Sequence, residues 1–344
     1  MSTNVSPDHM DKILRFLDER PDPDWKWDFD DSATGESPMN ALALGNLALL
    51  AYSGEDDMER FLTNWGFKGG FRFLIAGDTV GFVARRTDSD TSSVFISYRG
   101  TEPTMIPEWL SDIDYQQADL TGFPGKIHGG FGQAFSSVMP QTKQALADLP
   151  GARHYFTGHS LGGAITVLAA ATFRNQVTAV YTYGQPRVGD KTFSDAYDEV
   201  LGEVTFRYVN NYDIVPHVPP ERLPAPLPPL PGDLLDVRQD LADFESGVDT
   251  IVTGELFTHV GQLRLFIDGT PEANAITDQT VSQKVTDFND HDPFVLHPPD
   301  LRDPLRGIRD RVNLALNGDR GIIDHDPAHG YLPRLRQQAG LVPR

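Results

Sequence analysis

The sequence has no cysteine, few basic residues and no long hydrophobic run. Without cysteine the chain can form neither a disulfide nor a thiolate metal site, so cysteine usage indicates no redox compartment. Its 29 lysine and arginine residues face 49 aspartate and glutamate residues, which gives a formal net charge of −20. This negative charge argues against binding to nucleic acid or to an anionic membrane surface. The longest apolar stretch, residues 41–51, is too short to span a bilayer.

The start of the sequence lacks the features of a secretory signal. Residues 1–7 have neither the basic start nor the apolar run that such a signal needs. We therefore expect a cytoplasmic protein, with export by another route as the alternative. The 344 residues, 39% hydrophobic and 23% charged, suit a globular protein with one large α/β domain or two small ones.

Helix-like and strand-like segments alternate along the sequence. Helices are expected at residues 39–53, 56–65, 132–148 and 163–174, and strands at 71–84, 94–98, 153–157, 177–183 and 204–209. This alternation predicts an α/β fold with a mostly parallel sheet covered by helices on both faces. We expect a polar N-terminal arm (1–38) and a single catalytic domain (39–344) with a proline-rich loop (216–231) and an inserted loop region (268–320).

The stretch Gly158-His159-Ser160-Leu161-Gly162 is a G-x-S-x-G motif between an expected strand and an expected helix. Strand, sharp turn and helix are the context of the nucleophile elbow in α/β-hydrolases. Such a turn strains the serine backbone, and the two glycines avoid collisions where the strand and the helix approach each other. We predict that Ser160 is the nucleophile of an acyl-transfer reaction. The alternative is a glycine-rich turn in which the serine has no function.

A serine hydroxyl is a weak nucleophile at neutral pH and needs a histidine base that a carboxylate orients. In the α/β-hydrolase order the acid follows the serine, and the histidine follows the acid. Asp213 comes just after the strand expected at residues 204–209 and precedes apolar residues that would keep water away. We predict Asp213 as the acid. Asp190, after the preceding strand, is the alternative.

Of the ten histidines, those after Asp213 fit this order. His217 is too near Asp213 in the sequence to fold back onto it easily. His259 precedes an expected strand at 260–267, and a parallel strand would place it at the wrong edge of the sheet. We predict that His325 is the base; it precedes a short C-terminal helix that ends near Gln338. The alternatives are His259 and then His329.

The negative charge of a tetrahedral intermediate requires two preorganised hydrogen-bond donors. One expected donor is the N–H of Leu161, and the other is Thr101, which follows the strand at 94–98 and offers an N–H and a hydroxyl. The next segment combines apolar side chains with prolines. We interpret it as a lid helix beside the site, with a helix packed in the core as the alternative, and its apolar residues are Met105, Ile106, Trp109 and Leu110.

Taken together, these motifs resemble the class 3 lipases, which include fungal triacylglycerol lipases and plant phospholipase A1-type acylhydrolases. The matching segments run in family order from about residue 39 to 217, and they lie at 98–101, 108–112, 127–131, 157–163, 183–190 and 213–217. The resemblance implies the same nucleophile, acid and oxyanion donors. It further implies that Asp112 orients the Thr101 hydroxyl, that residues 105–110 form a lid, and that His128 and His217 are structural.

The C-terminal part departs from the family pattern. Family members end with a histidine that is followed shortly by a tyrosine, and here His325 and Tyr331 fit with slightly longer spacing, with His329 between them. The segment beginning at His259 resembles a family feature that leads into a late strand. The proline cluster has no counterpart in the family. Secreted fungal members carry disulfides, which this chain lacks.

These observations predict a carboxylic ester hydrolase that works through an acyl-Ser160 intermediate without a metal or an organic cofactor. Acylglycerols at a lipid–water interface are the expected substrates, because the expected lid is apolar and the chain is acidic. A phospholipase A1 and a soluble-ester carboxylesterase of the same family are the alternatives. A third alternative is a non-catalytic, lipid-binding relative.

Overall fold

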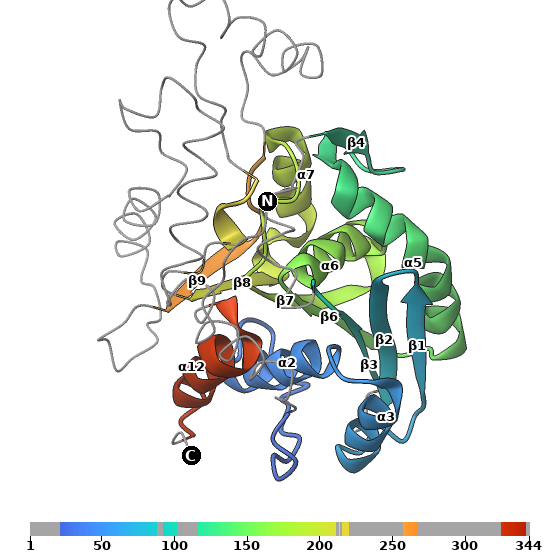
Figure 1. Ribbon diagram of the computed structural model, residues 1–344, viewed down its shortest axis with the longest axis vertical. Coiled ribbons are helices and arrows are strands. Elements are labelled where there is room, and N and C mark those ends of the chain that lie inside the picture. The colour runs from blue at the N-terminus through green and yellow to red at the C-terminus, as the bar shows by residue number, and fades with distance from the viewer. Residues whose placement is uncertain are drawn as a thin grey trace, which may run out of the picture.

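A computed structural model describes residues 21–87, 92–101, 116–210, 213, 215–219, 257–266 and 325–341. At its centre lies a seven-stranded sheet in the order β1-β2-β3-β6-β7-β8-β9 (Figure 1). The strands are β1 (Phe71–Ala76), β2 (Thr79–Arg86), β3 (Ser93–Tyr98), β6 (Arg153–His159), β7 (Val177–Tyr183), β8 (Thr205–Asn210) and β9 (Gln262–Phe266). A second, two-stranded sheet pairs β4 (Gln117–Asp119) with β5 (Lys126–His128).

The large sheet is antiparallel at one edge and parallel elsewhere. Strands β1, β2 and β3 pair antiparallel, while β3, β6, β7, β8 and β9 are parallel neighbours. The prediction of one strand over residues 71–84 is wrong, because the chain reverses at Gly77 and Asp78 and Ala76 pairs with Thr79. Gly77 adopts a φ of 59°, which glycine reaches without strain. The prediction of a mostly parallel sheet is confirmed.

Helices cover both faces of this sheet, as predicted (Figure 1). Helices α5 (Gly129–Asp148), α6 (Leu161–Thr172) and α7 (Lys191–Leu201) lie on one face. Helices α2 (Pro38–Leu50), α3 (Glu55–Asn64) and α12 (Leu332–Gln338) lie on the other. Short helical turns complete the described elements: η2 (Arg174–Gln176), η3 (Gly202–Val204), η4 (Val215–His217) and η6 (Pro327–Tyr331).

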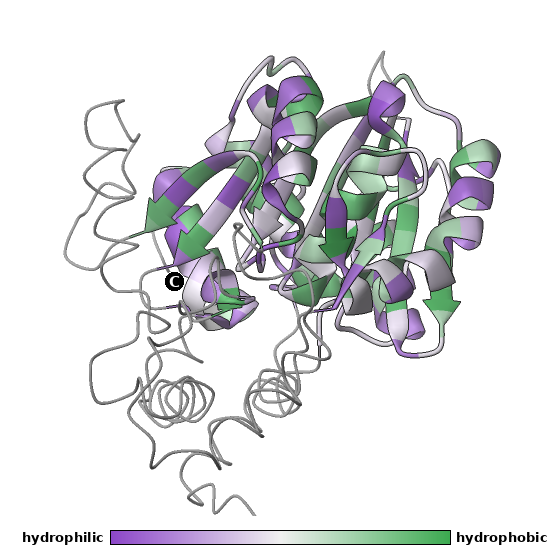
Figure 2. Ribbon diagram, turned by 90° about the horizontal axis from the view of Figure 1, so that it is seen from above, coloured by the Kyte–Doolittle hydropathy of each residue, from purple (hydrophilic) through white to green (hydrophobic). Residues whose placement is uncertain are grey.

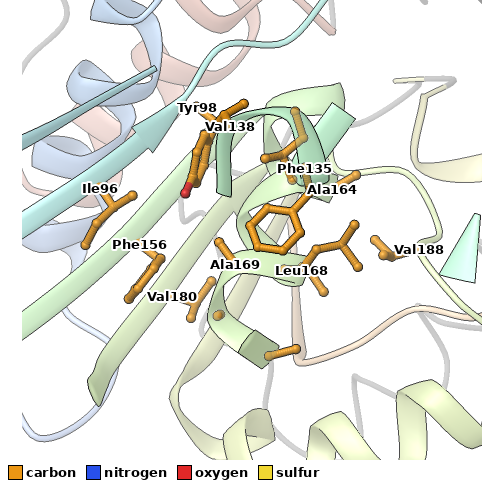
Figure 3. Close-up of a cluster of buried hydrophobic side chains, with 14 of the residues drawn as sticks. Ile96, Tyr98, Phe135, Val138, Phe156, Ala164, Leu168, Ala169, Val180 and Val188 are labelled. Carbon is orange, nitrogen blue, oxygen red and sulfur yellow. The ribbon is translucent and has the colours of Figure 1, made fainter. Parts of the chain in front are cut away.

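Each face of the sheet has its own hydrophobic core. Ile96, Phe156 and Val180 of the sheet pack against Phe135 of α5 and Leu168 of α6 on the first face (Figure 3). Residues 162–171 of α6 are all buried, which is why this helix is apolar all round. Helices α3 and α7 bury one side only. Figure 2 accordingly shows hydrophobic and hydrophilic residues mixed along helices at the surface.

The segment before α2 differs from the polar arm that we expected for residues 1–38. Trp25 packs on Trp65, Trp27 on Phe95 and Phe29 on Tyr155, with ring centroids 5.0, 5.2 and 4.8 Å apart. The charged residues between these aromatic residues face solvent. The physical reason is an alternation of period two, which places every aromatic side chain of this extended segment on the core. Residues 21–37 are therefore part of the folded body.

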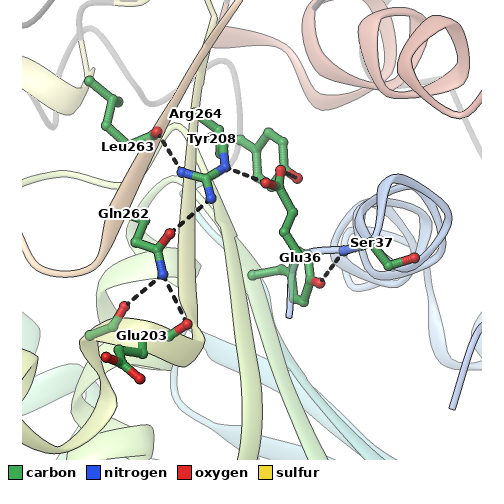
Figure 4. A network of polar contacts seen from close by, with 9 residues as sticks. Glu36, Ser37, Glu203, Tyr208, Gln262, Leu263 and Arg264 are labelled. Atoms are coloured by element: carbon green, nitrogen blue, oxygen red, sulfur yellow. Dashed lines mark hydrogen bonds and ion pairs between the residues drawn. The ribbon is translucent and has the colours of Figure 1, made fainter. Parts of the chain in front are cut away.

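A polar network ties the same segment to the far edge of the sheet (Figure 4). The carboxylate of Glu36 accepts a hydrogen bond from the Tyr208 hydroxyl at 2.6 Å and pairs with Arg264 Nε at 2.5 Å. The N–H of Ser37 donates to the Tyr181 hydroxyl at 3.1 Å. Three neighbouring strands, β7, β8 and β9, are thus joined to the residues that precede α2.

Several predicted features lie outside the described residues. They are the lid residues Met105, Ile106, Trp109 and Leu110, Asp112, residues 220–231 of the proline-rich loop and the inserted region 268–320. Among the helices that the structure does describe, none combines the length and the apolar character that crossing a membrane requires.

Candidate active site

The parallel strands bring three predicted site residues to one end of the sheet, where the strands finish. In the register of the sheet, Tyr98 of β3 lies beside Gly158 of β6, and Tyr183 of β7 lies beside Tyr208 of β8. The segments that carry Thr101, Ser160, Gly184 and Asp213 therefore all leave the sheet at the carboxyl ends of the parallel strands. Ligand sites of α/β sheets form at this end because the loops after the strands meet there.

Ser160 occupies a sharp turn between β6 and α6. Its φ of 58° and ψ of −132° lie outside the regions that L-residues favour, and it is the single non-glycine residue with positive φ in the described part of the chain. The N–H of Ser160 donates to the Tyr183 carbonyl at 2.9 Å, which holds the turn against β7. A strained serine between a parallel strand and a helix is the nucleophile elbow of the α/β-hydrolase fold. The predicted fold class is confirmed.

Both glycines of the motif lie where backbone segments approach closely. A Cβ atom on Gly158 would collide with the Gly162 carbonyl oxygen and lie 2.6 Å from the Thr166 hydroxyl. A Cβ atom on Gly162 would collide with the carbonyl oxygen of Tyr98, at the end of β3. The first collision, between strand and helix, is the one that the motif predicts. The second shows that the turn also packs against the strand that leads to Thr101.

Asp213 and His325 are in direct contact although 112 residues separate them. The Nδ1 atom of His325 lies 2.9 Å from each carboxylate oxygen, and the exposed fractions of the two residues are 0% and 1%. A carboxylate only accepts hydrogen bonds, so Nδ1 carries the proton and Nε2 of the neutral ring keeps its lone pair. This is the form in which an imidazole can take a proton from a hydroxyl.

The carboxylate of Asp213 is itself held in place. The N–H of Val215 donates to Oδ1 at 2.9 Å, and the Tyr331 hydroxyl donates to Oδ2 at 2.5 Å. Tyr331 also accepts a hydrogen bond from the N–H of Asn210 at 3.0 Å, so its hydroxyl links the end of β8 to the acid. The sequence signal for Tyr331 was its place in the histidine–tyrosine pattern. That pattern does not reveal its partner.

The acid–histidine pair lies beside the Ser160 turn. The rings of His325 and His159, the residue before Ser160, are 4.4 Å apart between centroids. A Cβ atom on Gly184, which follows β7, would lie 2.7 Å from Asp213 Oδ2 and 2.8 Å from His325 Nδ1. Ser160 Oγ and His325 Nε2 are both buried, and neither has a hydrogen-bond partner among the described residues. Two unpartnered buried atoms of opposite role, a hydroxyl donor and an imidazole acceptor, suit a site that exchanges protons with a substrate.

The two predicted oxyanion donors flank the same turn. Leu161 is the first residue of α6, where helical N–H groups have no partner within the helix. Gly100, the residue before Thr101, is close enough that a Cβ atom on it would lie 2.8 Å from the Cβ of Ser160. Thr101 itself is half-buried. The structure thus brings both predicted donors near the Ser160 turn.

The alternative residues occupy other places. Asp190 caps the N-terminus of α7, accepting from the Phe193 N–H at 2.7 Å. His259 precedes β9, and its buried imidazole faces Arg187, Arg207, His217 and the main chain of Pro216. His128 caps α5 by accepting from the Phe131 N–H at 3.3 Å. The side chain of His329 lies outside the described residues.

His159 has contacts that the sequence did not reveal. Its Nδ1 atom lies 2.8 Å from the Tyr52 hydroxyl, and its Nε2 atom lies 2.5 Å from the main-chain carbonyl oxygen of His325. Burial holds the pKa of His159 well below its ordinary value, and nearby His325 lowers the pKa further. The residue is neutral in the folded protein.

Acid is expected to destabilise the fold through His159. Below the ordinary pKa of 6.5, the unfolded chain binds a proton at this residue that the native state does not bind, because the folded pKa is lower. The free energy of unfolding therefore falls as the pH falls from 6.5 toward the folded pKa. In urea unfolding at a series of pH values, we expect the wild type to lose up to about 1.4 kcal/mol more per pH unit than His159→Gln. Parallel curves for the two proteins would contradict this expectation.

Comparisons with known proteins bear on the same region. Residues 95–223 match the family model for Lipase (class 3). A lipase of Rhizomucor miehei is 34% identical over 155 residues, covering 42% of this chain and 41% of that protein. The secreted mono- and diacylglycerol lipase 1 of Fusarium solani is 32% identical over 162 residues, covering 43% of this chain and 47% of that protein. The chain thus spans less than half the length of these curated relatives.

Among solved structures, the triacylglyceride lipase of Rhizomucor miehei aligns with a TM-score of 0.41 and 27% identity. The alignment covers 59% of this chain and 67% of that one.

Proposed function

We propose that this chain, which matches the class 3 lipase family over residues 95–223, hydrolyses carboxylic esters with Ser160, His325 and Asp213 as a catalytic triad. The observation that carries the proposal is the contact of His325 Nδ1 with both carboxylate oxygens of Asp213. Asp213 holds Nδ1 with both oxygens, which leaves Nε2 as a proton acceptor beside the turn of Ser160. A strained serine next to such an imidazole is arranged for nucleophilic attack.

In the first half of the proposed reaction, Ser160 Oγ attacks the ester carbonyl carbon while His325 Nε2 takes the hydroxyl proton. The electrons of the C=O double bond move onto oxygen, and the N–H of Leu161 together with Thr101 stabilises that negative charge. His325 then gives its proton to the leaving alkoxide oxygen as the C–O bond breaks. The products of this half are a free alcohol and an acyl group on Ser160.

In the second half, a water molecule replaces the alcohol. His325 Nε2 removes a proton from the water as its oxygen bonds to the acyl carbon, and the same two donors hold the new oxyanion. When this intermediate collapses, Ser160 Oγ leaves and recovers the proton from His325. Asp213 stays ionised throughout and stabilises the imidazolium in both halves. These steps use protein groups and water alone.

We propose acylglycerols as the substrate class. Support comes from relatives named as a lipase and as a mono- and diacylglycerol lipase, and from the net charge of −20, which disfavours anionic phospholipid surfaces. The test compares emulsified triacylglycerol with a monomeric short-chain ester. A lipase acting at an interface gives a rate that rises above the solubility limit of the lipid. A rate that stays flat there favours a soluble-ester carboxylesterase, and faster release of fatty acid from phospholipid vesicles favours a phospholipase A1.

The covalent step has a direct test. A fluorophosphonate probe is expected to label the protein at Ser160, with the adduct located by peptide mass spectrometry. Ser160→Ala is the matched control and should take up no probe. A folded wild-type protein without an adduct would contradict the proposal and favour a non-catalytic, lipid-binding relative.

Tyr331→Phe tests how the acid is held. The change removes the hydroxyl that donates to Asp213 and leaves the Asn210 N–H without its acceptor. Because hydrogen bonds to charged groups contribute about 1.5–3 kcal/mol, we expect kcat on a short-chain ester to fall at least about tenfold and the melting temperature to fall as well. A variant with wild-type kcat would show that Val215 N–H and His325 suffice to hold the carboxylate.

A further inference from the structure

The imidazole of His159 bridges two parts of the chain that meet at Ser160. It belongs to the last residue of β6 and is 1% exposed. One of its nitrogens contacts Tyr52, just beyond α2, and the other contacts the main chain of His325. The triad chemistry proposed above does not use this imidazole.

These two contacts fix which nitrogen of His159 carries the proton. A carbonyl oxygen only accepts hydrogen bonds, so Nε2 must donate to the His325 carbonyl. In the neutral ring Nδ1 is then an acceptor, and the Tyr52 hydroxyl donates to it. The His325 carbonyl therefore selects the neutral tautomer with the proton on Nε2, and the Tyr52 hydroxyl gives Nδ1 a donor.

The consequence for His325 is that it is held at two points. Its side chain is held by Asp213, and its main chain is held by His159. His159 is covalently joined to Ser160, so this second hold relates the position of His325 to the turn that carries the nucleophile. Proton transfer depends steeply on such placement, because a shift of about 1 Å can cost about a hundredfold in rate.

The neutral state of His159 matters for the same reaction. In the proposed mechanism His325 becomes an imidazolium, and its ring centroid is 4.4 Å from that of His159. A positive charge on His159 would oppose the new charge. The other groups that face His159 are Tyr52, whose hydroxyl contacts Nδ1, and Tyr331, whose ring centroid is 5.8 Å away.

We propose that His159 is a positioning residue for ester hydrolysis: its Nε2–H holds the main chain of His325 against the Ser160 turn, and the Tyr52 hydroxyl holds the imidazole ring from its other nitrogen. The inference rests on the proposed function. It adds two residues that do not touch the substrate but set the geometry of proton transfer. Its measurable consequence is a loss of kcat with little change in KM.

The test uses the full chain and a monomeric short-chain ester. His159→Met removes the donor at similar size, whereas His159→Gln keeps an N–H at the end of the side chain. We expect kcat to fall about 10- to 100-fold in His159→Met with KM within about twofold of wild type, and His159→Gln to recover most of the loss. Wild-type kcat in His159→Met, or an equal loss in both variants together with an equal fall in melting temperature, would overturn the inference.

A second comparison covers the case in which His159→Met does not fold. Tyr52→Phe removes the hydroxyl that contacts Nδ1 of His159. Tyr197→Phe is its control, because the hydroxyl of Tyr197, a buried residue of α7, bonds to Thr205. Tyr52→Phe is expected to lower kcat by about tenfold, with Tyr197→Phe unchanged. Equal kcat in the two variants would overturn the inference. If the wild type neither labels with fluorophosphonate nor hydrolyses ester, the proposed function fails instead.

Discussion

Replacing His325 with alanine is expected to lower kcat for ester hydrolysis about 10⁶-fold, the loss found when the base of a serine triad is removed. The expectation follows from the contact between His325 Nδ1 and both oxygens of Asp213, which leaves Nε2 for the serine proton. Without the imidazole, the Ser160 hydroxyl has no proton acceptor. Initial rates on a soluble ester, at protein concentrations verified by absorbance, give the measurement.

The matched controls are His259→Ala and His329→Ala. The buried imidazole of His259 faces Arg187, Arg207 and the main chain of Pro216, so we expect its replacement to leave kcat within about threefold of wild type once folding is verified. His329→Ala is expected to behave in the same way. A protein that loses activity in the His259 variant but keeps it in the His325 variant would show that the base is assigned wrongly.

Asp213→Asn is expected to lower kcat about 10⁴-fold while leaving the fold intact. The amide keeps the shape of the carboxylate but can present an N–H to His325, which favours the tautomer with its proton on Nε2. That tautomer cannot accept the serine proton. The loss should appear in kcat on a short-chain ester and in the rate of fluorophosphonate labelling.

Asp190→Asn is the control for this change. Asp190 caps α7 through the N–H of Phe193, and asparagine caps helices about as well as aspartate. We therefore expect both kcat and the melting temperature to stay close to wild type. Activity lost in Asp190→Asn and retained in Asp213→Asn would exchange the roles assigned to the two carboxylates.

Much of the fold follows from local sequence patterns. The bounds of β7 agree with the prediction, and the elbow at Ser160 follows from two glycines placed where a strand meets a helix. Chain order and the parallel sheet led to Asp213 and then to His325. The contact between the two side chains agrees with this reasoning, because loops after parallel strands meet at one end of the sheet, whatever the details of packing.

The missed features depend on contacts between distant parts of the chain. The turn at Gly77 and Asp78 has a weak local signal, so the sequence predicts one strand where the structure has β1 and β2. Tyr52 and His159 are 107 residues apart, and no spacing rule indicates that their side chains meet. Likewise, the segment before α2 has a polar composition because charged residues alternate with aromatic ones. Its aromatic side chains nevertheless pack on the core.

The ion pair of Glu36 with Arg264 has a consequence for truncated forms of the protein. A fragment cut to residues 95–223 would keep Ser160 and Asp213 but would lack His325 and three strands of the large sheet. A longer fragment that starts at α2 would still lack the carboxylate of Glu36, which contacts Tyr208 of β8 and Arg264 of β9. Strand β8 leads directly to Asp213. We therefore expect the smallest unit that folds on its own to begin before α2. Expression boundaries drawn from motif matches alone would remove contacts that hold β8, the strand that leads to Asp213.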